Sequence, residues 1–475
     1  MSADRPINAD VEGQQEPPEP VGKPKTAEEQ PKEAPRGEPT PKSDKPARPR
    51  RGIPGPIKLV TALVLIAVGF IVLAIVAGGG GSKKNNQGAA PSPVNTAVAK
   101  KGPTAAPSSE AEGESSGGEG AEAPKPGAEA LGYPSFATSN TTRIGGPDPT
   151  SNAAAAALAV FPGTNEKQRP VAVALVGTED WAGAIAAAVL MAEPIRAPLL
   201  FGEAGGVPGP TAEALGSLQP PGGAASGGDA VFAVGEVQVP QGMSAAKVAP
   251  GDAATEAAAI ARLRNRIAGS KPEAFILASS SEPAFAAPAA AYAARSGDPV
   301  LFTDAKELPR ETIAALRRNK GIPVYALGPG SAISDKVLNE VEGVGAAKVQ
   351  RISGANPVAA AIAFARFGEG KFGWHVTDPG HGFVLARSAS PLEAAAAAPL
   401  SASGTWGPLL LTDSADTLPS ELRGYFLDVK PGYTNDPTRA FYNHVWIIGN
   451  AGQISIGLQA EVNEVAELAK IGGEE

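Results

Sequence analysis

The sequence has no cysteine, three histidines and few aromatic residues, and each scarcity excludes something. Without cysteine the chain cannot form disulfides, thiolate zinc sites or cysteine nucleophiles, and its redox compartment cannot be read from the sequence. Aromatic residues are only 5% of the chain, so a folded core must be built from Ala, Val, Leu and Ile. We therefore predict a core of small, closely packed side chains.

The part of the chain after Asn140 also lacks an excess of basic residues. It contains 33 Asp and Glu against 25 Lys and Arg, a net charge of −8. No overall basic field exists to attract a polyanion, so we predict no nucleic-acid partner. Any binding of an anionic polymer must rely on local sites.

The N-terminal part is poor in apolar residues, apart from one block. Residues 1–56 are rich in Pro, Glu and Lys. Such a segment cannot bury enough apolar surface to offset the entropy of ordering, so we predict a disordered cytoplasmic tail. The simplest interpretation is a solvated tail without a specific partner.

The apolar block is Leu59–Ala77, 19 residues without a charge, which is long enough to cross a bilayer. Many more basic residues precede it than follow it, so we predict a transmembrane helix at 57–78 in the cell membrane, with everything downstream extracytoplasmic. A cleaved signal peptide is the alternative, but the segment before the block is far too long for one. Residues 79–140 are rich in Gly, Ser, Pro and Glu, which predicts a flexible linker.

Three similar successions follow, at residues 141–240, 241–347 and 348–470. Equivalent prolines at 198, 299 and 408 are spaced by 101 and 109 residues. In each succession, short apolar runs alternate with Ala-rich stretches of helical length, and Leu-Pro-x-Glu at 308–311 and 418–421 predicts helix starts. The pattern predicts an α/β fold of three tandem doubly wound, flavodoxin- or Rossmann-like parallel-sheet repeats with pseudo-threefold symmetry.

The successions carry the same motifs in the same order: an Arg-Ile-x-Gly opening, a Pro-aliphatic-Leu strand, and a closing strand followed by Ile-Ser. The motifs stand at Arg143–Gly146 and Arg351–Gly354, at Ala197–Leu200, Asp298–Leu301 and Gly407–Leu410, and at Leu327–Ser334 and Ile448–Ser455. In this order they resemble the type 2 family of cell wall-binding repeats of Gram-positive surface proteins. The resemblance spans nearly all of residues 141–470.

This resemblance implies noncovalent attachment to a cell-wall polymer, without catalysis, by three repeats that form a triangular module. The polymer would be a glycopolymer, in this family often an anionic one, or peptidoglycan. The chain departs from the family pattern in three places. The usual Asp-Ala-Leu at the second helix is blurred to Asp180–Ala182 in the first copy and absent from the other two. The second copy has Val248–Gly251 where the Arg opening is expected, and the first has Gly235–Gln238 in place of the Ile-Ser segment.

Candidate ligand-binding residues lie where the first strand of each repeat ends. In open parallel sheets, ligands settle beyond the carboxyl ends of the strands, where helix N-termini expose free N–H groups that bind phosphate or sugar hydroxyls. The alternative is that these side chains only cap the following helices. The candidates are Thr178 and Asp180 in the first repeat, Ser279, Ser280 and Ser281 in the second, and Arg387, Ser388 and Ser390 in the third.

Arg143 and Arg351 are further candidates, because a guanidinium group pairs with phosphate or carboxylate through its planar fork. The alternative, which we favour, is that each pairs with an acidic residue of the neighbouring repeat.

The histidines and tryptophans carry weaker hypotheses. His375 and His381 flank Asp378, but a spacing of six does not fit one helix face, and the segment is typical of a surface loop. We therefore predict no metal site and no cofactor. Trp181, Trp374, Trp406 and Trp446 would stack on sugar rings if exposed, although packing in the core is the more common role.

We predict that a membrane-tethered module of three repeats binds a cell-wall polymer on the outer side of the membrane. The alternative is a degenerate repeat scaffold that binds another envelope protein. An enzyme acting on wall material has no support, because no paired carboxylates, catalytic triad or metal constellation recurs at corresponding positions.

Overall fold

The computed structural model of the 475-residue chain describes residues 136–403 and 407–472. The predicted tail (1–56), membrane span (57–78) and most of the linker (79–140) lie outside these residues. Between 136 and 403, and between 407 and 472, no helix is both long and apolar enough to span a membrane.

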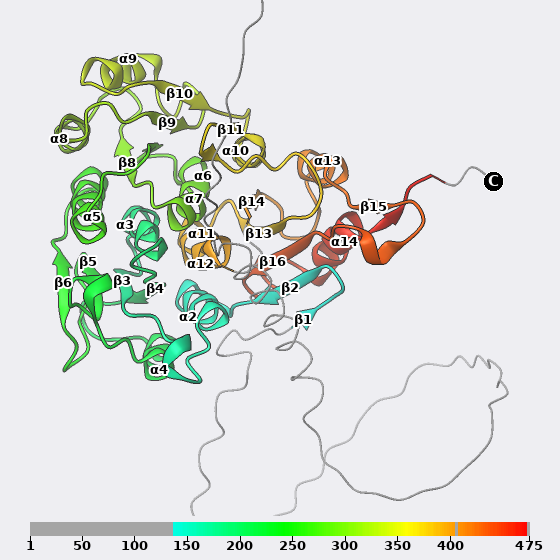
Figure 1. Cartoon of the computed structure of the whole chain (residues 1–475), viewed down its shortest axis with the longest axis horizontal. Coiled ribbons are helices and arrows are strands. Elements are labelled where there is room, and N and C mark those ends of the chain that lie inside the picture. Colours follow the sequence, from blue (N-terminus) through cyan, green and yellow to red (C-terminus); the bar gives the residue numbers. More distant parts are fainter. Residues whose placement is uncertain (1–135, 404–406, 473–475) are drawn as a thin grey trace, which may run out of the picture. The chain divides into compact units, whose positions relative to one another are not determined.

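The described part is built around three sheets of parallel strands (Figure 1). The first sheet has the spatial order β4 (Leu199–Gly202), β3 (Val173–Gly177), β5 (Val231–Val234), β6 (Ala245–Val248). The second has the order β8 (Val300–Thr303), β7 (Phe275–Ser279), β9 (Val324–Leu327), β10 (Val349–Ile352). The third has the order β14 (Leu409–Thr412), β13 (Gly382–Arg387), β16 (His444–Ile448), β2 (Thr141–Ile144), with the short β1 (Phe136–Ala137) antiparallel to β2.

All three sheets share one topology. The first strand of each sheet (β3, β7 or β13) pairs with the second strand on one side and with the third strand on the other. A fourth strand then pairs with the free side of the third. The fourth strands of the first two sheets, β6 and β10, come from the opening of the next repeat. In the third sheet, β2, the opening strand of the first repeat, fills the equivalent place beside β16. The sheets are therefore offset by one strand from the sequence repeats 141–240, 241–347 and 348–470.

Helices connect these strands. The first sheet has α3 (Trp181–Ala187), η2 (Ala188–Met191), α4 (Gly209–Leu218) and η3 (Ala224–Ser226), preceded by α2 (Pro149–Val160) and η1 (Glu166–Gln168). The second has α5 (Ala253–Ala268), α6 (Pro283–Ala286), α7 (Pro288–Ser296), α8 (Arg310–Arg318) and α9 (Asp335–Gly343). The third has α10 (Pro357–Arg366), α11 (Pro391–Ala396), α12 (Ala398–Ala402), α13 (Ser420–Asp428), η4 (Pro437–Arg439) and α14 (Ile456–Ala466).

Both predicted Leu-Pro-x-Glu helix starts are confirmed, because α8 and α13 begin directly after Pro309 and Pro419. Two pairs of very short strands complete the elements: β11 (Gly368–Glu369) with β12 (Phe372–Gly373), and β15 (Gly432–Tyr433) with β17 (Ala469–Lys470).

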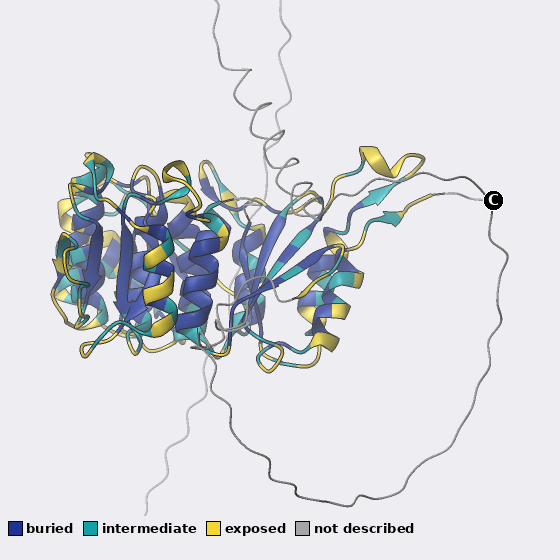
Figure 2. Cartoon of the chain, turned by 90° about the horizontal axis from the view of Figure 1, so that it is seen from below, coloured by how far each residue is buried: buried dark blue, intermediate teal, exposed yellow. Residues whose placement is uncertain are grey.

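Alanine-rich helices join the three sheets into one body. Helices α2, α3, α7, α11 and α12 pack against one another, and Figure 2 shows the helices of this region almost entirely buried. Because alanine projects only a methyl group, such helices approach closely and fill space densely. One continuous apolar core therefore includes residues of all three sheets, such as Leu175, Ile276 and Leu385.

The second sheet is covered on both faces. Ile276 and Phe302 face the shared core, whereas Phe275 and Leu301, their neighbours along the strands, face a separate core beneath α8 and α9. This alternation explains why the strands read as uninterrupted apolar runs in the sequence.

Arg143 on β2 fastens the third sheet. Its side chain is 1% exposed, and its guanidinium donates to Gln459 Oε1 at 3.0 Å, to Gly449 O at 2.9 Å and to Asn450 O at 3.0 Å. Burial lowers the pKa of Arg143 to about 10, so the group stays charged at neutral pH. Its contacts join β2 to the loop after β16 and to α14.

Replacing Arg143 by Met should therefore destabilise the fold. The variant leaves buried carbonyl groups without donors, and we expect it to lower the free energy of unfolding by about 3 kcal/mol. Urea denaturation followed by circular dichroism measures the change. The exposed Arg439→Met is the matched control and should stay close to the wild-type chain. Equal stability of the two variants would contradict the role given to Arg143.

Candidate functional site

The loop after the first strand of each sheet has the same backbone arrangement in all three sheets. The residue that ends the first strand pairs with the residue that ends the second: Gly177 with Gly202, Ser279 with Thr303, and Arg387 with Thr412. The following amide then donates to the carbonyl of that partner, from Thr178 at 3.2 Å, Ser280 at 2.9 Å and Ser388 at 2.9 Å. The candidate residues of the three repeats thus occupy corresponding places.

In the first sheet this edge forms an acidic cavity of about 490 Å³, which we call the carboxyl-end cavity. Thr178 and Asp180 both line it, as do Gly235 and Gly251. The acidic residues in its lining are Glu179, Asp180, Glu203, Glu236 and Glu256, and its described lining contains no Lys, Arg or His. Such a cavity repels phosphate and carboxylate groups.

Asp180 and Glu256 form a carboxyl pair in this cavity. Asp180 caps α3, with its Oδ1 accepting from Gly183 N at 2.7 Å. Glu256 on α5 is 3% exposed, and its Oε1 accepts from Gly251 N at 2.9 Å. Burial, followed by the hydrogen bond with Asp180, raises the pKa of Glu256 to about 8. Glu256 is therefore mostly protonated at neutral pH.

Sequence reasoning missed Glu256. It lies far from Asp180 along the chain, on a helix that reads as an ordinary amphipathic one. The single available signal was an acidic residue among the alanines of α5, which is also common on a solvent-facing helix surface.

In the second sheet the candidate serines bond within the protein. Ser279 Oγ and Ser281 Oγ lie 3.2 Å apart. Ser280 Oγ donates to Thr303 O at 3.2 Å and to Asp304 Oδ1 at 2.8 Å. These hydroxyls order the turn between β7 and α6.

In the third sheet Arg387 bridges two loops. Its Nη1 donates to Gln453 O at 3.0 Å and its Nη2 to Asp413 O at 3.1 Å. Ser390 stands at the N-cap of α11, without a side-chain hydrogen bond to the helix backbone. The buried Glu393 accepts a hydrogen bond from the Gln453 side chain, and burial raises the pKa of Glu393 to about 7.

Arg351 occupies in the second sheet the place that Arg143 occupies in the third. Arg351 Nη1 donates to Gly328 O at 3.0 Å, as Arg143 does to Gly449, and each glycine directly follows the third strand of its sheet. Arg351 also forms an ion pair with Asp335 at 2.7 Å, and Asp335 lies in the preceding repeat. Lys247 holds the same register position in the first sheet. Arg143 and Arg351 thus hold the fourth strands of their sheets, whereas the exposed Lys247 has no side-chain hydrogen bond or ion pair among the described residues.

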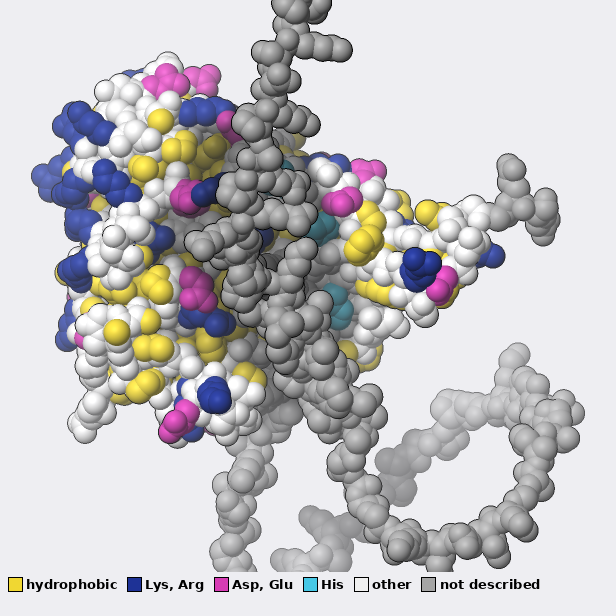
Figure 3. All heavy atoms as spheres, in the orientation of Figure 1, with side chains coloured by type: hydrophobic (Ala, Val, Ile, Leu, Met, Phe, Trp, Pro, Cys, Tyr) yellow, Lys and Arg dark blue, Asp and Glu magenta, His cyan; other side chains and the backbone are white. Residues whose placement is uncertain are grey.

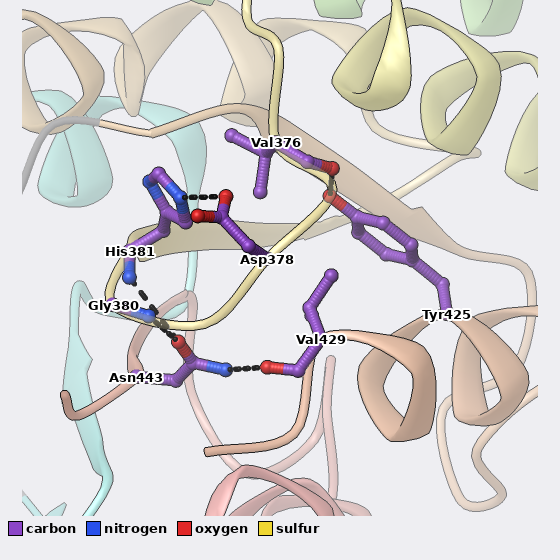
Figure 4. Close-up of polar contacts among 7 residues, drawn as sticks. All are labelled: Val376, Asp378, Gly380, His381, Tyr425, Val429 and Asn443. Carbon is purple, nitrogen blue, oxygen red and sulfur yellow. Dashed lines mark hydrogen bonds and ion pairs between the residues drawn. The ribbon is translucent and has the colours of Figure 1, made fainter. Parts of the chain in front are cut away.

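The segment that contains His375 and His381 is a loop, and side chains from elsewhere in the third repeat hold its backbone by hydrogen bonds (Figure 4). The buried Asn443 accepts from the amides of Gly380 and His381 at 2.9 and 3.1 Å. His381 Nε2 lies 3.2 Å from Asp378 Oδ1. Among the described residues, no three His, Asp or Glu side chains gather as they would around a metal ion.

The tryptophans outside the gap at 404–406 are all at least half-buried. Trp374 packs edge-on against Tyr292 and lies beneath the guanidinium of Arg295, 5.1 Å from the ring centre. Trp181 packs edge-on against Phe302, and Trp446 against His444. Trp406 lies outside the described residues.

Residues 250–338, from the start of α5 into α9, match the family model of Cell wall binding domain 2, CWB2. This segment is a CWB2 repeat. It is the family that the repeated motifs predicted, and the match supports binding to the cell wall in general. No curated protein matches the chain.

Two solved structures have a similar fold. Cwp8 from Clostridium difficile is 18% identical, with a TM-score of 0.53 over 69% of this chain and 52% of that chain. Cwp6 from Clostridium difficile is 16% identical, with a TM-score of 0.56 over 69% of this chain and 48% of that one. The present chain thus spans about half the length of either protein, and at these identities the similarity concerns the fold alone.

The raised pKa of Glu256 predicts that stability depends on pH. The pKa is about 8 in the fold and 4.5 for an ordinary glutamate, so between these values the folded chain binds more protons than the unfolded chain. The contribution of this group to stability therefore falls as the pH rises through this window. Glu256→Gln keeps the acceptor for Gly251 and removes the titration.

We expect the melting temperature of Glu256→Gln to fall less than that of the wild type between about pH 5 and about pH 8. Differential scanning calorimetry over this range measures the difference. Glu203→Gln, an exposed carboxylate of the same cavity, is the control and should follow the wild type. Parallel pH profiles for all three proteins would show that Glu256 titrates normally.

Proposed function

We propose that this protein binds a cell-wall polymer noncovalently on the outer side of a membrane to which its N-terminal segment tethers it. The observation that carries the proposal is the CWB2 match at residues 250–338, set among three sheets of identical strand order. The uncharged apolar run at 59–77, with basic residues before it, supports the tether.

In this proposal the three sheets act as one rigid, pseudo-threefold module. The alanine-rich helices that meet between the sheets support a fixed arrangement, since a shared core resists relative motion. The pairing of β2 with β16 supports it further, because it joins the first repeat to the last.

The acidic residues of the carboxyl-end cavity bear on where an anionic polymer binds. Five acidic side chains line the cavity in the first sheet, and the candidate hydroxyls in the second already bond within the protein. We therefore expect polymer recognition to depend on a surface other than this cavity. Peptidoglycan, which offers neutral sugar hydroxyls, stays a candidate ligand.

We propose no catalytic step. The polar groups at the ends of the first strands serve the fold: Ser280 bonds Asp304, Arg387 bonds backbone carbonyls, and Asp180 caps a helix. No nucleophile paired with a histidine recurs at these places within the described part of the chain.

One observation favours the alternative of a scaffold that binds an envelope protein. Phe441 and Tyr442, which precede β16, are 71% and 54% exposed. Adjacent exposed aromatic side chains are typical of protein contact sites. This alternative predicts a partner that depends on these two residues.

Sedimentation with isolated cell walls tests the proposal. The full-length chain in detergent should sediment with intact walls, and it should stay in the supernatant once secondary polymers have been stripped from them. Sedimentation that survives stripping identifies peptidoglycan as the ligand. No sedimentation with either preparation would overturn wall binding and favour the scaffold. The Phe441→Ser, Tyr442→Ser double variant is the control, because it should bind walls as the wild type does.

A further inference from the structure

A larger cavity, of about 910 Å³, lies on the side opposite the carboxyl ends of the second sheet. It opens beside Ala274, Asp298 and Pro323, which lie one or two residues before β7, β8 and β9. Arg196 from the first repeat and Lys371 from the third also line it. We call it the junction cavity, because all three repeats contribute to its wall. Its volume is within the roughly 300–1,000 Å³ typical of ligand sites.

Arg264 on α5 is a buried cation in this wall. It is 8% exposed, and both of its described hydrogen bonds use Nη1, to Asn265 Oδ1 at 3.2 Å and Ser270 O at 3.3 Å. A Cβ added at Gly297 would lie 2.9 Å from Arg264 Nη2. Glycine at this position therefore avoids a steric clash with the guanidinium. Desolvation lowers the pKa of Arg264.

The buried carboxylate nearby does not form an ion pair with Arg264. Asp298 Oδ1 accepts from Glu273 N at 3.1 Å and Ala274 N at 2.9 Å, and burial raises the pKa of Asp298. Within the described residues, no carboxylate lies within 4.0 Å of the Arg264 guanidinium. Asp298 attracts Arg264 only at longer range. Buried charges in proteins are normally in direct contact with a partner, so this guanidinium favours an anion in the cavity.

The rim of the cavity carries further positive charge that forms no ion pair, although the Arg295 guanidinium lies over the Trp374 ring. Its three rim carboxylates are already paired: Glu193 with Arg196 at 3.5 Å, Glu273 with Lys371 at 2.8 Å, and Glu369 with Lys348 at 2.5 Å. Lys271 and Arg295 are exposed and have no ion pair with any described residue. With Asp298 counted, the lining holds five Lys and Arg side chains and four Asp and Glu side chains, so its net charge is slightly positive.

Aromatic side chains give the cavity a fixed shape. Tyr325 and Phe372 stack with ring centres 3.7 Å apart and planes within 5°. Tyr292 Oη accepts from Gly373 N at 2.8 Å, which holds the β11–β12 pair against α7. These rings are at most 5% exposed, so they shape the wall rather than offer stacking faces.

We propose that the junction cavity binds a sugar unit that carries a phosphate or carboxylate group, as a segment of an anionic wall glycopolymer. Arg264, Lys271 and Arg295 would surround the oxyanion, and the apolar wall would exclude water beside it. This inference rests on the proposed wall binding and assigns it a site. It also accounts for polymer recognition by a chain of net negative charge, since the positive charge is local.

The test compares two double variants that remove the same charge. Lys271→Gln, Arg295→Gln acts at the cavity. Arg317→Gln, Arg318→Gln acts at the end of α8, away from the cavity lining. Both side chains are exposed and form no ion pair with any described residue. Figure 3 shows Lys and Arg side chains gathered along the edge of the molecule that α5 and α8 form. This edge is therefore a demanding control for nonspecific charge attraction.

Isothermal titration of the full-length chain in detergent uses three probes: poly(glycerol phosphate), polygalacturonate and neutral dextran. The first two probes distinguish a phosphate from a carboxylate ligand. We expect tight binding of at least one anionic probe and none of dextran. The cavity variant should weaken this binding about tenfold or more, and the α8 variant by less than about threefold.

Equal loss in both variants would overturn the site, because it would reduce binding to general charge attraction. So would wall sedimentation that the cavity variant leaves unchanged, although the proposed function would then stand. Failure of the wild-type chain to sediment with walls would overturn the proposed function itself. Melting curves of both variants check that they fold, as exposed side chains lead us to expect.

Discussion

The pairing of β2 with β16 is the contact on which the described fold depends. Each sheet needs a fourth strand beside its third, and in the first two sheets the next repeat supplies it. At the third sheet the chain instead uses its own first strand, and Arg143 fixes that strand by bonding the loop after β16. An uncovered strand edge invites pairing with other chains. Here β2 covers the edge of β16, and β1 pairs with Thr142 and Arg143 on the other edge of β2.

Closure brings the three sheets around a common set of helices, and alanine makes this packing possible. Larger side chains on α7, α11 and α12 would hold these helices apart. Where the helices end, near the amino ends of the second sheet, the packing leaves the junction cavity open. The cavity therefore results from how the repeats meet, and a single repeat would not form it.

The two ends of the sheets differ in charge. The carboxyl-end cavity gathers acidic groups, and burial, followed by the hydrogen bond with Asp180, raises the pKa of Glu256 to about 8. In the junction cavity the three rim carboxylates are paired with cations, and Lys271 and Arg295 have no ion pair among the described residues. General rules for open α/β sheets direct attention to the carboxyl ends, but here the electrostatics favour an anionic ligand at the opposite end.

The sequence by itself determined the strands, the helices between them, the three successive repeats and the family of the middle one. These features follow from local apolar runs, helix-start residues and motif order, which a linear reading detects. It also placed Thr178, Ser280 and Ser388 at equivalent loops. The offset between sheets and repeats, the uncharged partners of Arg143 in place of the predicted acidic one, and the proximity of Asp180 to Glu256 emerge only in the folded chain. Each arises from contacts between residues far apart along the chain, and such contacts leave no periodic pattern in the residues that make them.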